Sequence, residues 1–188
     1  YGTMTSSPRR FLPYGRQQID DDDVAAVTDV LRGNTLTTGP KAVAFEQILA
    51  EATGVTHAVA CSSGAAALHL AAMALNLGPG DKVVVPTLTF LATANAARFV
   101  GADVVFADVD PDTGLMEPEH LEQALEQGEG NIKAVFPVHL GGQSPDMAAI
   151  HKIAERNGLA VVEDASHAIG GTYSSPNGKV TVGECSHS

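Results

Sequence analysis

The stretch "KVVVPTLTFLATANAARF", residues 82–99, decides the class of fold. It opens with an unbroken apolar run, Val83 to Val85, and this run ends at Pro86, which has no backbone N–H to donate. A run without polar alternation is typical of a strand that is buried on both faces, as in parallel sheets. The small and apolar residues at 91–99 then predict a helix. The stretch therefore indicates a strand followed by a helix that covers the sheet.

The same alternation continues in both directions along the chain. Further apolar runs predict strands at 57–61, 102–110, 132–139 and 159–165. Apolar spacing and capping residues predict helices at 20–33, 37–54, 64–77, 117–128 and 145–158. Asn177-Gly178 favours a hairpin over 173–183. Five strands separated by helices predict an α/β fold whose mostly parallel sheet carries helices on both faces.

Composition excludes several classes of function. The 188-residue chain has a formal net charge of −11, and its 11 Lys and Arg residues are scattered. Nucleic acid and anionic membranes need clustered basic residues, so neither is expected as the main partner. The two cysteines, Cys61 and Cys185, belong to no CxxC motif, which favours reduced thiols over a disulfide or a metal site. No apolar run approaches the length of a membrane span.

The residues after the predicted strands are the candidate ligand-binding residues, because open α/β sheets bind ligands beyond the carboxyl ends of their strands. Ser62-Ser63-Gly64-Ala65 follows the first predicted strand and opens a helix. Small residues allow close backbone approach, and a helix N-terminus offers free N–H groups to a phosphate. An ordinary tight turn between strand and helix explains the same residues equally well.

Two single residues at strand ends carry weaker signals. Phe90 follows the second strand and suits either a stacking contact with a planar ligand or the hydrophobic core, which is the more common place for Phe. His139 follows the fourth strand without a second His at metal-ligand spacing, which favours a structural role.

Asp164 follows the last strand, and His167 lies three residues beyond it. A carboxylate at a buried strand end is costly unless it meets a cation. A protonated pyridine nitrogen is such a cation, and a nearby carboxylate keeps it charged. The alternative role for Asp164 is a helix cap or a surface ion pair. Taken together, the strand ends predict a site for pyridoxal 5′-phosphate (PLP).

Six further segments occur in a fixed order: "LTTGPKAVAFE" (36–46), "SSGAAALHLA" (62–71), "PTLTFLATANA" (86–96), "GADVVFADVD" (101–110), "PVHLGGQSPDM" (137–147) and "VVEDASHAIGGTY" (161–173). In this order they resemble the DegT/DnrJ/StrS family of PLP-dependent sugar aminotransferases. The resemblance runs from about Pro13 to the end of the chain. It implies an aspartate-aminotransferase-like, type I PLP large domain, with the small C-terminal domain absent from residues 1–188.

The resemblance also implies roles for individual residues. Asp164 matches the acid that pairs with the pyridine nitrogen, and His167 matches the His or Gln near the phenolic oxygen of the cofactor. Phe90 matches the aromatic residue that stacks on the ring. The phosphate-binding turn corresponds to Ser63, Gly64 and Ala65.

The opening residues 11–40 look most similar to members that act in pseudaminic acid synthesis. Those enzymes transfer the amino group of L-glutamate to C4 of a UDP-linked 4-keto-6-deoxy N-acetylamino sugar. The segments that contact nucleotide sugar in related enzymes correspond to Tyr14, Asn34, Thr35, Leu36 and Thr37. The resemblance further implies a cytoplasmic enzyme that is a homodimer when full length.

One element of the family pattern is missing, namely the lysine that forms a Schiff base with PLP and moves the proton. None of the five lysines has the family's sequence context, so no catalytic residue is expected in residues 1–188. We expect this lysine just downstream and little activity from the chain alone. The five are Lys41, Lys82, Lys133, Lys152 and Lys179.

Several alternatives stay open. The chain could belong to an aminotransferase for another 3- or 4-keto sugar linked to dTDP or GDP. It could belong to a family dehydratase in which His replaces the lysine, or to a relative that only binds or regulates. A nicotinamide-dependent Rossmann enzyme is disfavoured, because the turn at 62–66 lacks the G-x-G-x-x-G pattern.

Overall fold

The computed structural model describes residues 17–175 and 178–184. The chain forms two compact units, residues 1–40 and 41–188, and each is described by itself. No helix within the described residues is both long and apolar enough to cross a membrane.

In the first unit, helix α1 (Asp21–Arg32) begins and ends where the sequence predicts. Asp20 caps it by accepting hydrogen bonds from the N–H groups of Asp22 and Asp23, and the Asp23 carboxylate accepts from the N–H of Asp20. This reciprocal capping box satisfies N–H groups that the first helical turn leaves unpaired. The acidic run at 20–23 is thus a helix start.

The second unit contains a parallel sheet of four strands in the order β2-β1-β3-β4. The central strand β1 pairs in parallel with β2 on one side and β3 on the other, and β3 pairs in parallel with β4. The strands are β1 (Asp81–Pro86), β2 (Asp103–Ala107), β3 (Asn131–Val135) and β4 (Ala160–Val161). The predicted α/β class with a parallel sheet is confirmed.

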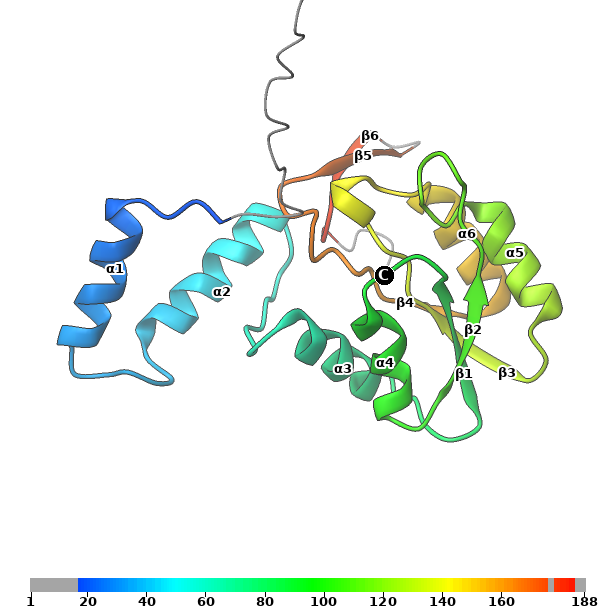
Figure 1. The fold of residues 1–188 in the computed structure, drawn as a ribbon, viewed down its shortest axis with the longest axis horizontal. Helices are drawn as coiled ribbons and strands as arrows, with labels where there is room; N and C mark the ends of the chain where they lie inside the picture. Colours follow the sequence, from blue (N-terminus) through cyan, green and yellow to red (C-terminus); the bar gives the residue numbers. More distant parts are fainter. Residues whose placement is uncertain (1–16, 176–177, 185–188) are drawn as a thin grey trace, which may run out of the picture. The chain divides into compact units, whose positions relative to one another are not determined.

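Helices cover both faces of this sheet (Figure 1). Because side chains alternate along a strand, Val83 and Val85 of β1 pack into one cluster and Val84 into the other. Helices α3 (Gly64–Ala74) and α4 (Leu91–Phe99) supply the first cluster, through residues such as Leu68 and Ala96. Helices α5 (Pro118–Gln127) and α6 (Met147–Asn157) supply the second.

The remaining elements flank this layered core. Helix α2 (Pro40–Thr53) precedes α3, and a short 3₁₀ turn, η1 (Leu140–Gly142), follows β3. The predicted hairpin is present as antiparallel strands β5 (Thr172–Ser175) and β6 (Gly178–Thr181). Gly178, expected in the turn, instead pairs with Ser175 as the first residue of β6, and Asn177 lies outside the described residues. Tyr173 and Val180 of the hairpin are buried in the same cluster as α5 and α6.

The strand predicted at 57–61 is not formed. The segment is irregular and mostly exposed, with Val59 78% exposed. A strand needs a neighbour for its backbone N–H and C=O groups, and in the described residues no strand pairs with this segment. The N–H of Ala60 instead donates to the Glu46 carboxylate at 2.8 Å. Only four of the five predicted parallel strands are therefore present.

Candidate active site

The backbone at the carboxyl end of the sheet places Asp164. Regular pairing of β3 with β4 ends at Val135 and Val161, and Pro137 then lacks the N–H that would continue it. The two segments meet again in a parallel bridge between Val138 and Asp164. The N–H of Asp164 donates to the Pro137 carbonyl at 2.9 Å, and the N–H of His139 donates to the Asp164 carbonyl at 3.0 Å. Asp164 is thus anchored at a strand end, as predicted.

The Asp164 side chain is a buried carboxylate, with the residue 6% exposed. The Thr93 hydroxyl donates to Oδ2 at 2.7 Å. The Ser166 hydroxyl donates to Oδ1 at 2.7 Å, and the Ser166 N–H lies 3.3 Å from the same oxygen. No Lys, Arg or His in the described part of the chain forms an ion pair with Asp164. Hydroxyl donors hold this carboxylate, and among residues 17–175 and 178–184 no basic side chain pairs with it.

The N-terminus of α3 lies beside this carboxylate. Ser63 caps the helix by accepting from the N–H of Ala66 at 3.1 Å. The N–H groups of Gly64 and Ala65 donate to no acceptor within the described residues. A methyl group added at Gly64 would lie 3.2 Å from the Ser166 hydroxyl, which itself contacts Asp164. Within the described residues, the N–H groups of Gly64 and Ala65 therefore have no acceptor and lie near the buried carboxylate of Asp164.

Phe90 is not part of the core. The residue is 75% exposed and occupies the N-cap position of α4, directly after the β1 loop. Its neighbour Thr89 shares a 2.8 Å hydrogen bond with Thr93, the same residue that contacts Asp164. The core alternative for Phe90 is excluded, and the stacking role stays a prediction.

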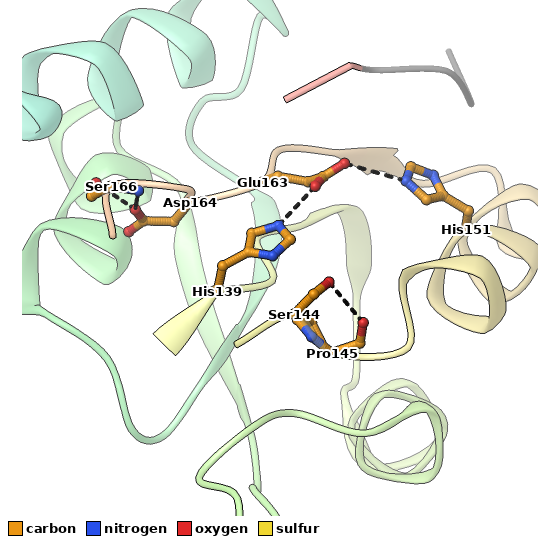
Figure 2. Close-up of polar contacts among 7 residues, drawn as sticks. All are labelled: His139, Ser144, Pro145, His151, Glu163, Asp164 and Ser166. Carbon is orange, nitrogen blue, oxygen red and sulfur yellow. Dashed lines mark hydrogen bonds and ion pairs between the residues drawn. The ribbon is translucent and has the colours of Figure 1, made fainter. Parts of the chain in front are cut away.

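Glu163 precedes Asp164 and points to the opposite side of the segment, toward two histidines (Figure 2). Its carboxylate accepts from Nε2 of the fully buried His139 at 2.7 Å and lies 3.6 Å from Nε2 of His151, an ion-pair distance. Burial by itself raises the pKa of Glu163. The contacts with His139 and His151 lower this pKa by more than burial raises it, and the result is a pKa of about 2. Glu163 is therefore ionised, and the structural role of His139 stays a prediction.

The other predicted site residues fall in different places. His167 is exposed in the turn after Asp164. Asn34, Thr35, Leu36 and Thr37 are exposed in the other unit, between α1 and α2, so their substrate role stays a prediction. Tyr14 lies outside the described residues.

Sequence reasoning missed the two residues that hold the Asp164 carboxylate. Position 166 carried a signal, because an Asp side chain commonly accepts a hydrogen bond from the backbone N–H two residues later. Thr93 carried none, since it lies 71 positions from Asp164 and inside a helical pattern. Within the described residues, no cluster of three or more His, Cys, Asp or Glu side chains could hold a metal ion.

With the fold and the carboxylate site in place, comparison with known proteins identifies the class. Residues 17–187 match the model of the DegT/DnrJ/EryC1/StrS aminotransferase family, and the chain belongs to this family. The family and its structural homologues bind PLP.

Solved structures agree with this assignment. An aminotransferase of the family from Brucella abortus is 41% identical, with a TM-score of 0.73 over 78% of this chain and 40% of its own. DesV of S. venezuelae is 37% identical, with a TM-score of 0.73 over 78% of this chain and 39% of its own. The PLP form of a putative sugar aminotransferase from Streptococcus pneumoniae is 32% identical, with a TM-score of 0.78 over 86% and 44%. The chain thus spans about two fifths of the length of these structures.

The residues present fit PLP. The cofactor carries a cationic ring nitrogen and an anionic phosphate. In the described part of the chain, the site has a buried carboxylate with no paired cation and two N–H groups at a helix start with no acceptor. The exposed ring of Phe90 lies on the loop joined to this carboxylate through Thr89 and Thr93.

Proposed function

We propose that this chain is the PLP-holding part of a nucleotide-sugar aminotransferase. The observation that carries the proposal is the Asp164 carboxylate, which is buried, held by two hydroxyl groups and paired with no cation in the described residues. Burying an unpaired charge is costly, so a cationic ligand at this position would stabilise it. When bound, PLP supplies an electron sink whose strength depends on the ring nitrogen staying protonated.

The residues of this chain would divide the work of binding. Asp164 would hold the proton on the ring nitrogen, and the N–H groups of Gly64 and Ala65 would bind the phosphate. Phe90 would cover one face of the ring and keep water from it. His167 would lie near the phenolic oxygen.

The lysine that amino transfer requires is not among the five in this chain. Lys82 is the second residue of β1 and Lys133 the middle residue of β3, so neither is at the carboxyl end where Asp164 lies. Lys41 lies in α2 and Lys179 in β6, outside the parallel sheet. Lys152 lies on α6 in a surface groove that also contains Glu122 and Arg156. We therefore place the catalytic lysine, together with the small domain, outside residues 1–188.

For the substrate we propose a UDP-linked 4-keto-6-deoxy N-acetylamino sugar, with L-glutamate as the amino donor. The support is the sequence of residues 11–40, which is similar to the 4-aminotransferases of pseudaminic acid synthesis. Remote contacts with the nucleotide would provide binding energy that a free hexose lacks. The active protein is proposed to be a homodimer.

The test of this function uses the gene product that contains residues 1–188 and its downstream sequence. It is given PLP, glutamate and a panel of acceptors, and 2-oxoglutarate is measured. The acceptors are UDP- and dTDP-linked 3- and 4-keto-6-deoxy sugars, free hexoses and simple 2-oxo acids. We expect product with UDP-linked 4-keto sugars and none with free hexoses. Product formed only with 3-keto sugars would contradict the C4 assignment. Product formed only with simple 2-oxo acids would contradict sugar transfer altogether.

A second test concerns Phe90. Phe90→Leu should weaken binding of pyridoxamine 5′-phosphate by roughly threefold to tenfold, the usual worth of an aromatic contact, whereas Phe90→Tyr should not. Because the residue is 75% exposed, neither change should alter the thermal unfolding midpoint. Isothermal titration and a thermal melt measure the two quantities. Equal affinity for the Leu and Tyr variants would exclude stacking.

A further inference from the structure

Thr93 is a polar residue in an apolar place. It lies in α4 with no exposed surface, in a helix whose buried residues are otherwise Ala92, Ala96 and Ala97. A valine would have nearly the same shape without a hydroxyl to desolvate, so the hydroxyl needs a partner to offset the cost of its burial. That partner is Oδ2 of Asp164, 2.7 Å away.

Other helical threonines in the same chain behave differently. The hydroxyls of Thr28 and Thr53 donate to carbonyls four residues earlier, those of Val24 and Leu49, both at 2.8 Å. This is the local bond that Ser and Thr usually make within a helix. Thr93 makes no such bond and instead donates to a residue on another element.

The hydrogen bonds around Thr93 have a fixed direction. An ionised carboxylate can only accept, so the single Thr93 hydroxyl proton goes to Asp164. In the 2.8 Å contact between Thr89 and Thr93, Thr89 must therefore be the donor. The result is a chain of donors from Thr89 through Thr93 to Asp164. Successive hydrogen bonds of this kind polarise and strengthen one another.

The donors around Asp164 leave one acceptor site of its carboxylate unoccupied. A carboxylate has about four acceptor sites, two on each oxygen. Ser166 directs both its N–H and its hydroxyl at Oδ1, while the only donor to Oδ2 among the described residues is Thr93. The remaining acceptor site is thus on Oδ2, the oxygen that Thr93 orients.

We propose that Thr93 is a positioning residue that orients Oδ2 of Asp164 toward the ring nitrogen of the cofactor, with Thr89 fixing the Thr93 hydroxyl. The inference rests on the proposed function, since it requires the ring nitrogen to lie at Asp164. According to this inference, the contact between Asp164 and the ring nitrogen depends on α4, which carries Thr93, as well as on the segment after β4, which carries Asp164. It also joins the carboxylate to the loop that carries Phe90.

The test compares two ligands that differ only at the ring nitrogen. Pyridoxamine 5′-phosphate and its 1-deaza analogue, which has carbon in place of that nitrogen, are titrated against the 188-residue chain. The amine form is used because the aldehyde of PLP would label surface lysines. The ratio of the two affinities isolates the contact between Asp164 and the ring nitrogen. The variants are Thr93→Val, Thr93→Ser, Asp164→Asn and, as a matched control on the exposed face of the hairpin, Thr172→Val.

We expect Thr93→Val to lower the affinity ratio roughly tenfold or more, because Oδ2 is then no longer held toward the ring nitrogen and the charged hydrogen bond between them is lost. Thr93→Ser keeps the hydroxyl and should keep the ratio, as should Thr172→Val. A merely structural role would weaken both ligands equally, leave the ratio unchanged and overturn the inference. Thermal unfolding and circular dichroism of each variant establish that it is folded, and Thr93→Ser against Thr93→Ala provides a second pair should Val not fold.

The Asp164→Asn variant distinguishes failure of the positioning role of Thr93 from failure of the proposed function. If Asp164→Asn lowers the ratio and Thr93→Val does not, the positioning role of Thr93 is wrong and the proposed function stands. If Asp164→Asn itself leaves the ratio unchanged, the ring nitrogen does not lie at Asp164 and both proposals fail.

Discussion

Replacing Asp164 by Asn should leave the chain folded and remove most of its affinity for pyridoxamine 5′-phosphate. The single amide oxygen can still accept from Thr93 or from Ser166, so one of the two hydroxyl contacts survives, and the amide N–H group can donate to the other hydroxyl. The charge opposite the ring nitrogen is lost, which is worth about 1.5–3 kcal/mol for a contact with a charged group. Affinity should fall roughly tenfold to a hundredfold, and titration calorimetry measures it.

The same substitution in the longer gene product should abolish most amino transfer, because an unprotonated ring nitrogen makes a weaker electron sink. Asp112→Asn, at an exposed position in the loop before α5, is the matched control and should change neither quantity. Wild-type turnover with glutamate in Asp164→Asn would show that the carboxylate has only a local structural role.

Glu163→Gln should give the largest change in stability. In the folded chain Glu163 has a pKa of about 2 against an ordinary value of 4.5, because its contacts with His139 and His151 outweigh its burial. A carboxyl whose folded pKa is lowered stabilises the fold while it is ionised. The difference corresponds to roughly 3 kcal/mol at neutral pH. Gln retains one hydrogen bond to His139 but no charge, so most of this should be lost in urea unfolding at pH 7.

The pH dependence gives this prediction a sign. The folded state binds fewer protons at Glu163 than the unfolded state, so the stabilisation is complete above about pH 4.5. It should decline as the pH falls from there toward about 2. In Glu163→Gln this part of the acid-unfolding profile should be flatter, whereas Glu155→Gln, an exposed control on α6, should match the wild type. Parallel profiles for Glu163→Gln and wild type would contradict the pairing.

Much of the fold could be predicted from the sequence, because its signals are local. The valine run at 83–85 and the helical spacing at 91–99 each depend on neighbouring residues alone, and β1 and α4 formed where they were expected. The same is true of the capping residues before α1 and of the residues that form the hairpin. The segment 57–61 has an equally good local pattern but is no strand, because a strand depends on a partner that local pattern does not reveal.

The candidate site divides along the same line. Asp164 and the turn at 63–65 could be found from sequence, because strand ends and helix starts are themselves local features. The sequence did not show that Glu163 and Asp164, adjacent in the chain, face different partners: two histidines for one and two hydroxyl groups for the other. Alternation along an extended backbone sends neighbouring side chains to opposite faces. Only tertiary packing decides which side chains lie on each face, and it places Thr93 next to Asp164 although the two are 71 residues apart in the sequence.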